Sequence, residues 1–374
     1  EGGITITADG KHCYLSASTK NRNGYNNFDL YNSQLIGGIW QPFESLGTPI
    51  NNDRSWDAQP SISADGQHLY FASNRPGGLG GTDIWHCHRL PNGDWSRPAN
   101  MGSTINTAGN EKCPFIHADG HTLYFASDGW QGFGGYDMYF INLDDPTTEQ
   151  PSNLGLPING EGDDICLGVT ANGATAYYAG RHPVRGLGGA DILSFDLYPA
   201  ARPESMTFSQ GIITSTNGLP LAATITIDRT ATLPAVYLID TSGKYRIMIS
   251  THETNLISVQ APGYIPFASI GLPQRTPGLL PDHIQLKPIE NHNPITLNIN
   301  PTQQKLRPID QRLLDIYIQF LLNNPTSSAT IEAPNKTISE QIHNYLLSKK
   351  LRPSRLKQTI GNTTILHIYC EKHN

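Results

Sequence analysis

The chain has 374 residues, more than one hydrophobic core normally serves, so several domains are expected. It contains 36 glycines and 27 prolines, with 37% apolar and 16% charged residues, which is typical of a turn-rich β protein. Residues 1–200 carry 10 basic and 21 acidic groups, which excludes electrostatic binding of nucleic acid by this part. The sequence has no run of about 18 consecutive apolar residues, the length that a membrane-spanning helix needs.

One phrase occurs four times in the first 200 residues. Each copy begins with an Ala-Asp-Gly or Ala-Asn-Gly turn, continues into a short aromatic and branched run such as Leu69–Ala72, and ends on an aspartate. The closing aspartates recur every 54 residues, at Asp29, Asp83, Asp137 and Asp191. A fixed period of this length indicates a repeat architecture. Hairpin turns and about four short strands per copy, with no helical period, predict the blades of a β-propeller.

A second phrase, of the type Leu-Gly-Thr-Pro-Ile-Asn, separates the copies at residues 46–51, 101–106 and 154–159. It is interpreted as the linker from the outer strand of one blade to the inner strand of the next. The first copy lacks this lead-in, and the chain begins at Glu1 without a methionine. We therefore expect at least one strand from upstream residues, through a fifth blade or a blade of mixed origin.

Two further domains are expected after Pro199–Pro203, where the repeat stops. Residues 205–290 contain alternating strands separated by glycine turns, which predicts a small β-sandwich. In residues 291–374 the pattern changes to two helices between strands; the first helix ends before Pro325, and a capping box at Thr337–Glu340 opens the second. The expected fold is multi-domain and mainly β: a propeller (1–200), a sandwich (205–290) and an α/β domain (291–374).

Each of the three segments resembles a known domain. The four copies, with their Ala-Asp-Gly-x-x-Leu-Tyr-Phe-Ala-Ser and Gly-Gly-x-Asp-Ile motifs, resemble the WD40-like repeats of TolB-type propellers. Residues 205–290 resemble a carboxypeptidase-regulatory-like domain through Gly218–Ala223, Gly243–Tyr245 and Gly263–Tyr264. Residues 291–374 resemble an OmpA-like C-terminal domain.

This order of domains is similar to that of PorE-type proteins, OmpA-family envelope proteins of the Bacteroidota type IX secretion system. The resemblance implies a place at the periplasmic face of the outer membrane. It also implies a lipoprotein, anchored through a segment that precedes Glu1.

The resemblance does not extend to the peptidoglycan clamp of OmpA-like domains, which is an Asp in a loop and an Arg on the following helix. Here Pro334–Lys336 leads directly into the second helix, so the loop that would carry the Asp is deleted. Gln341 and Ile342 stand at the place of the Arg. The OmpA-like domain is therefore degenerate, and no peptidoglycan-binding residue is transferred.

The repeated aspartates are interpreted as structural, because a short carboxylate in a Gly-rich loop commonly accepts hydrogen bonds from its own backbone. Aromatic residues in the same loops are candidates for partner binding, since loop aromatics are typical interface anchors. Packing between neighbouring blades is the other interpretation of these rings. The candidates are Tyr25, Phe28, Trp130, Phe133 and Tyr136.

No cofactor or metal site is expected. His86 and His88 alternate on one predicted strand, but zinc needs three or four ligands, and Cys87 points to the opposite face. Acidic residues at 53–57 and 161–164 lack the spacing of a calcium-binding loop and are interpreted as solvated.

The cysteines show no metal-binding spacing, and buried free thiols are expected. Cys113 and Cys166 occupy equivalent places in neighbouring copies. Equivalence by rotation does not by itself bring two Cα atoms within the roughly 4.4–6.8 Å that a disulfide requires.

No catalytic motif is found, since the sequence contains neither a G-x-S-x-G nucleophile elbow nor an HExxH zinc helix. We therefore expect a non-enzymatic periplasmic scaffold or adaptor of an outer-membrane-associated complex, which binds outer-membrane or periplasmic proteins through its propeller. The alternative is a peptidoglycan-anchoring lipoprotein of the type IX secretion system. A propeller hydrolase is a more distant alternative.

Overall fold

The computed structural model describes residues 3–20, 26–180, 191–229, 233–271, 280–290, 292–297, 299 and 305–370. The chain divides into two compact units. We call the first the blade unit; it consists mainly of residues up to Phe208 together with Arg246–His252. The second, the C-terminal unit, contains most of the remainder, including both described α-helices. The described chain is mainly β, as expected, and no described helix is long and apolar enough to cross a membrane.

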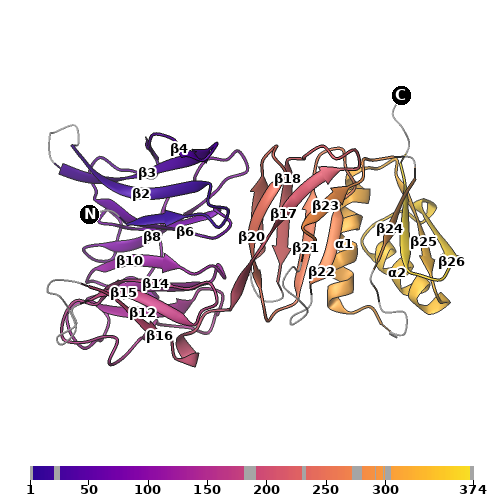
Figure 1. Ribbon diagram of the computed structural model, residues 1–374. Coiled ribbons are helices and arrows are strands. Elements are labelled where there is room, and N and C mark those ends of the chain that lie inside the picture. Colours follow the sequence, from indigo (N-terminus) through magenta and orange to yellow (C-terminus); the bar gives the residue numbers. More distant parts are fainter. Residues whose placement is uncertain are drawn as a thin grey trace. The chain divides into compact units, whose positions relative to one another are not determined.

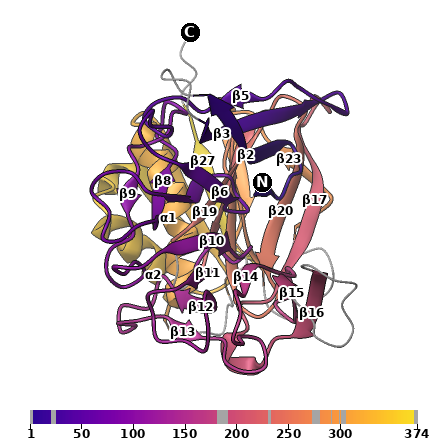
Figure 2. The same ribbon diagram turned by 90° about the vertical axis from the view of Figure 1, so that its left-hand side faces the viewer.

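Four antiparallel sheets follow one another through the blade unit (Figure 1). Strands adjacent in sequence are adjacent in each sheet, except that β5 pairs with β3 in the first. This is the topology of propeller blades, as predicted. Figure 2 shows β6, β10 and β14 toward the middle of this unit and β9, β13 and β16 at its periphery. The strands of the four sheets are, in order, β1 (Ile4–Ile6), β2 (His12–Lys20), β3 (Asn26–Ile36), β4 (Ile39–Trp40) and β5 (Glu44–Ser45); β6 (Asp57–Ile62), β7 (His68–Ser73), β8 (Asp83–His88) and β9 (Ala99–Asn100); β10 (Glu111–Ile116), β11 (Thr122–Ser127), β12 (Asp137–Asn142) and β13 (Ser152–Asn153); β14 (Ile165–Val169), β15 (Thr175–Gly180) and β16 (Asp191–Asp196).

The repeated Ala-Asp-Gly turn connects the first two strands of each blade. In the second blade Gly66 has φ +73°, a conformation that glycine adopts without strain. The Asp65 side chain accepts hydrogen bonds from the Ser63 hydroxyl and from the Gln67 backbone N–H. The strand that follows buries Phe71 completely against its neighbours. Turn chemistry and aromatic burial together explain why this phrase recurs in every blade.

Each inner strand from the second blade onward carries a β-bulge. Gln59, Cys113 and Cys166 have φ values of +56°, +49° and +60°, and the strand register shifts at each of them. A bulge re-aims the side chain that it carries. The side chain of Gln59, in β6, accepts a hydrogen bond at 2.9 Å from the backbone N–H of Cys113, in β10, and so connects the second blade to the third.

The asparagine that ends each linker phrase fastens the linker to the blade that precedes it. The side chain of Asn106 accepts from the backbone N–H of Ile84 at 2.8 Å and donates to the carbonyl of the same residue at 2.9 Å. Asn51 pairs in the same way with Leu30, and Asn159 with Met138. The linker is thus a hydrogen-bonded part of the blade.

The C-terminal unit contains strands of two sheets that correspond to the expected sandwich. One sheet has the order β20-β17-β23, with β17 and β23 parallel, and the other has the order β19-β18-β21-β22. Their bounds are β17 (Met206–Ser215), β18 (Ala223–Asp228), β19 (Ala235–Ile239), β20 (Lys244–Ser250), β21 (Asn255–Gln260), β22 (Phe267–Gly271) and β23 (His283–Leu286). The start of β17, up to Phe208, and the end of β20, from Arg246, belong to the blade unit.

The last segment forms a third sheet, of order β24-β27-β25-β26, with two helices. Its elements are β24 (His292–Thr296), α1 (Pro308–Asn323), β25 (Ser328–Ala333), α2 (Lys336–Ser348), β26 (Leu356–Ile360) and β27 (Ile365–Tyr369). Helix α1 contacts β21 and β22, and its buried residues join one core cluster with Leu256 of β21. The sandwich and the last segment therefore share a core, and the division into 205–290 and 291–374 stays a prediction.

Helix α2 begins two residues earlier than its predicted capping box. Asn335 is the N-cap, and its side chain accepts a hydrogen bond from the Ile338 backbone N–H at 2.8 Å. Asparagine is among the best N-cap residues, so the helix starts at Lys336 and includes Thr337 in its first turn.

Candidate functional site

The closing aspartates fasten the loop that precedes them. Asp83 is 1% exposed and accepts hydrogen bonds from the backbone N–H groups of Leu79 and Gly80. Asp137, also 1% exposed, accepts one from the N–H of Phe133 at 2.6 Å. In these two blades the carboxylates are directed at their own loops.

The glycines of these loops make room for the carboxylates. A Cβ atom added to Gly78 would lie 2.3 Å from Asp83 Oδ2, and one added to Gly132 would lie 1.5 Å from Asp137 Oδ2. Of the other closing aspartates, Asp29 lies in β3 opposite Ala17, and the side chain of Asn27 donates to it at 3.4 Å. Asp191 opens β16, next to residues 181–190, which lie outside the described chain.

Leu79 and Phe133 hold equivalent places at the tips of these loops. Each lies four residues before its closing aspartate and donates a backbone N–H hydrogen bond to that carboxylate. The side chains of Leu79 and Phe133 are 51% and 49% exposed. In the sequence, Tyr25 and Leu187 stand at the same place of the first and fourth repeats, but they fall outside the described residues. We call Leu79, Phe133 and their loops, 74–82 and 128–136, the loop-tip surface.

The remaining aromatic candidates are not grouped with Phe133. Trp130 is half-buried; its indole N–H donates to the Ile105 carbonyl at 2.9 Å, and its ring packs against the core of the blade. Tyr136 is half-buried, with the Lys112 ammonium 4.8 Å from its ring centroid. Both rings have packing partners and are less exposed than Phe133. Of the three candidates of the third blade, Phe133 therefore has the most exposed ring.

Phe28 is partly buried too and meets Trp56 edge to face, with 6.1 Å between the ring centroids. This is the packing role that the sequence left open for the loop aromatics. The fifth candidate, Tyr25, is outside the described residues.

Two exposed acidic residues lie in or beside the third-blade part of the loop-tip surface. Asp128 and Asp163 are exposed and accept hydrogen bonds from the backbone N–H groups of Asn110 and Tyr136. Burial raises the pKa of nearby Asp164. The described residues contain no cluster of three or more histidine, cysteine or acidic side chains placed to hold a metal ion.

The acidic segment at residues 53–57 differs from its prediction in one residue. Asp57 was interpreted as part of a solvated loop, but it is fully buried and forms an ion pair with Arg75 at 2.7 Å. The Arg75 guanidinium also lies 4.8 Å from the centroid of the Phe71 ring. No local sequence pattern predicts this pair, because its members are 18 residues apart and meet only when β6 and β7 form.

The second blade brings His68 together with the pair His86 and His88. In β7 and β8, His68 lies opposite His88 and Tyr70 lies opposite His86, so the three imidazoles share one face of the sheet. His68 Nδ1 is 3.0 Å from His86 Nε2. Burial, together with the neighbouring His68 and His88, lowers the pKa of His86 to about 4. The sequence shows this cluster only when the register of the β7–β8 hairpin is known, because the register decides which histidines lie opposite one another.

The cysteines are free, as expected, but two details differ. Cys166 is exposed, whereas Cys113 is buried. The two thiols, which occupy equivalent bulges of β10 and β14, interact: a hydrogen bond between them raises the pKa of Cys113 and lowers that of Cys166. The bulges aim the side chains at the neighbouring blade, which rotation alone does not predict.

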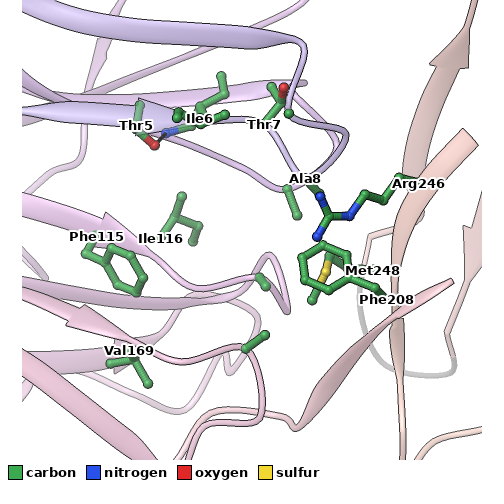
Figure 3. Close-up of a pocket in the computed structure, with 15 residues that line it drawn as sticks. Thr5, Ile6, Thr7, Ala8, Phe115, Ile116, Val169, Phe208, Arg246 and Met248 are labelled. Atoms are coloured by element: carbon green, nitrogen blue, oxygen red, sulfur yellow. Dashed lines mark hydrogen bonds between the residues drawn. The ribbon is translucent and has the colours of Figure 1, made fainter. Parts of the chain in front are cut away.

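Figure 3 shows a cavity of about 330 Å³. It lies where the inner strands end, whereas the loop tips lie where these strands begin. It is lined by residues of β1, β6, β10 and β14 and of the turns that follow them, and by Phe208 of β17 and Arg246 and Met248 of β20. All these residues belong to the blade unit. We call it the axial cavity. No local sequence pattern predicts this cavity, because its walls come from four different repeats and from two later strands.

In the C-terminal unit, the segment compared with the peptidoglycan clamp has structural roles. Asn335 caps α2, and of the two residues compared with the clamp arginine, Ile342 is fully buried and Gln341 is partly buried. Asn335 and Ile342 are thereby committed to the fold of the helix.

Comparison with known proteins yields distant likenesses in structure. No protein family model and no curated protein matches the chain. Solved structures that resemble it include TolB from Acinetobacter baumannii, with 16% identity and a TM-score of 0.35 over 67% of this chain and 54% of that one. A prolyl endopeptidase is 14% identical, with a TM-score of 0.33 over 70% of this chain and 31% of that one. The tricorn protease is 10% identical, with a TM-score of 0.35 over 66% of this chain and 23% of that one. The chain thus spans about half the length of TolB.

Proposed function

We propose that this protein is a non-enzymatic scaffold that binds a protein partner through the loop-tip surface of its blades. The observation that carries the proposal is the equivalent placement of Leu79 and Phe133, two large apolar side chains about half exposed at the tips of loops that a buried aspartate holds rigid. Rigid loops that present apolar side chains reduce the entropy lost on binding.

The partner is an outer-membrane or periplasmic protein, and the scaffold works at the periplasmic face of the outer membrane. The resemblance of the repeats to TolB-type propellers, and of the domain order to OmpA-family proteins of the type IX secretion system, supports this location. The last segment, with its β24-α1-β25-α2-β26-β27 order, serves as a docking module in this proposal. The packing of Ile342 at the clamp position argues against anchoring to peptidoglycan by the usual contacts.

A photo-crosslinking amino acid at position 133 tests the proposal in envelope preparations. We expect one partner to be captured repeatedly and to be lost when the chain also carries Leu79→Ala. The matched control places the crosslinker at Leu219, an exposed apolar residue (63%) of the C-terminal unit.

The double variant Leu79→Ala/Phe133→Ala should keep its melting temperature, because both side chains are largely outside the core, and should no longer co-purify the captured protein. Trp130→Ala, in contrast, should lower the melting temperature through lost packing. A folded double variant that retains the partner at full yield would place the binding surface elsewhere.

A further inference from the structure

The axial cavity has predominantly apolar walls. Its sides are formed by residues of the inner strands, including Ile62, Phe115, Ile116 and Val169. Its volume of about 330 Å³ lies at the lower end of the range found for small-molecule sites, roughly 300–1,000 Å³. Among its lining residues, Ile6 remains 50% exposed, so apolar surface is left that a ligand could cover.

The repeat keeps this cavity accessible. The alanines that open the Asp-Gly or Asn-Gly turns of the four blades all line it, namely Ala8, Ala64, Ala118 and Ala171. A larger side chain at these places would project into the same space. The phrase that builds the hairpins therefore also lines the cavity with small residues.

The cavity contains one charged lining residue, Arg246, on the same face of β20 as Met248. Figure 3 shows the Arg246 side chain reaching from its strand toward Ala8, beside the Phe208 ring. The centre of the guanidinium lies 4.0 Å from the centroid of that ring. Within the described residues Arg246 forms no ion pair, and this stacking leaves the edge of the guanidinium available for an anion.

The polar side chains at the cavity already have partners. The Thr5 hydroxyl accepts a hydrogen bond from the Ile62 backbone N–H, and the Thr7 hydroxyl donates to Asp9. Arg246 is thus the lining group best placed to orient a ligand, and the remaining walls favour an apolar body. The charge and the walls together select a molecule with one anionic end.

We propose that the axial cavity binds a small apolar carboxylic acid, whose carboxylate pairs with Arg246 and whose hydrocarbon part lies against the inner strands. A guanidinium matches a carboxylate through two parallel hydrogen bonds. This site is separate from the loop-tip surface and does not depend on it, because the two lie at opposite ends of the strands.

Titration calorimetry of the full 374-residue chain with octanoate tests the proposal. We expect saturable one-to-one binding of octanoate and weaker binding of 1-octanol, which has the chain but no charge. Arg246→Gln should weaken octanoate binding about tenfold or more and leave octanol binding unchanged. Lys244→Gln is the matched control: it removes the same charge from an exposed residue of the same strand that does not line the cavity, and should change the affinity by less than about twofold.

A second variant tests the walls independently of the charge. Ala118→Leu should weaken the binding of octanoate and octanol alike, while circular dichroism shows the β signal of the unaltered chain. The proposal is overturned if octanoate shows no saturable binding to the unaltered chain. It is also overturned if folded Arg246→Gln binds octanoate as tightly as the unaltered chain, because the carboxylate would then have another site.

Discussion

At the scale of single residues, the blades depend on buried carboxylates and amides that take the place of backbone partners. Asp83 accepts hydrogen bonds from the backbone N–H groups of Leu79 and Gly80, in the loop that precedes it, and from the side chain of Asn100 in β9. The two contacts with the loop are local in sequence, and a Gly-rich loop followed by an aspartate is a pattern that predicts contacts of this kind. The ion pair of Asp57 with Arg75 joins two strands and depends on their register, so it could not be predicted.

Replacing Asp83 with alanine should destabilise the blade unit by about 3 kcal/mol, because it leaves several loop donors without an acceptor. Urea denaturation followed by tryptophan fluorescence measures this loss. Asp94→Ala, in an exposed turn where the carboxylate accepts from Asn92, is the control and should cost less than about 0.5 kcal/mol. Equal losses for the two variants would show that the Asp83 contacts do not stabilise the fold.

His86 should make the blade unit less stable in acid. Its pKa is about 4 in the folded chain, below the roughly 6.5 of an unfolded chain, so between these values only the unfolded state binds the proton. The free energy of unfolding therefore falls as the pH decreases from about 6.5 toward 4. The upper limit of this fall is about 1.4 kcal/mol per pH unit, and the actual fall is smaller because the imidazole is partly exposed to solvent.

Denaturation midpoints between pH 8 and pH 4 test this. Below pH 6.5 the denaturation midpoint of His86→Gln should decline less steeply than that of the unaltered chain. The difference between the two midpoints at pH 8 is the baseline, because His86 is neutral there in both states. Parallel curves would show that His86 takes up its proton equally easily in both states.

At the scale of elements, local chemistry predicted the hairpins well and the element ends less well. The period of 54 residues and the Asp-Gly turns located the blades, because both depend on residues close in sequence. The bulges at Gln59, Cys113 and Cys166 were missed, since nothing in these side chains favours a positive φ and the conformation is imposed by the neighbouring strands. The axial cavity follows from the same cause: its walls exist only when four inner strands come together.

The start of α2 provides a test at this scale. Asn335→Ala should destabilise the C-terminal unit by about 1 kcal/mol, because it removes the acceptor for the Ile338 N–H. Thr337→Ala, at the position that the sequence favoured as the cap, should cost clearly less. Thermal unfolding followed by circular dichroism distinguishes the two; a larger loss for Thr337→Ala would restore the sequence-based assignment.

At the scale of the whole molecule, the compact units do not follow the sequence segments. Helix α1 belongs to the last segment by sequence, yet it contacts strands β21 and β22 of the sandwich, and Leu256 shares its core. Patterns of apolar residues show that α1 has a buried face, but they do not say which sheet that face meets. Contacts between distant segments decide how the molecule divides.

We expect two unfolding transitions, one for each unit, when the full chain is heated in a calorimeter. Leu314→Ala, in the buried face of α1, should lower one of them through a loss of about 2–5 kcal/mol, and Leu123→Ala, in the third blade, should lower the other. A third transition that responds to Leu314→Ala alone would mean that the last segment unfolds independently of the sandwich.

The pairing of each linker asparagine with the preceding blade has an evolutionary consequence. Because Asn51, Asn106 and Asn159 bind backward, to Leu30, Ile84 and Met138, a stretch from an inner strand to the next linker contains its own fastening. A gene duplication or deletion of one such stretch leaves every internal pair of the neighbouring copies intact. Each blade and the linker that follows it therefore form a unit that can be duplicated or deleted as a whole without separating an asparagine from its partner.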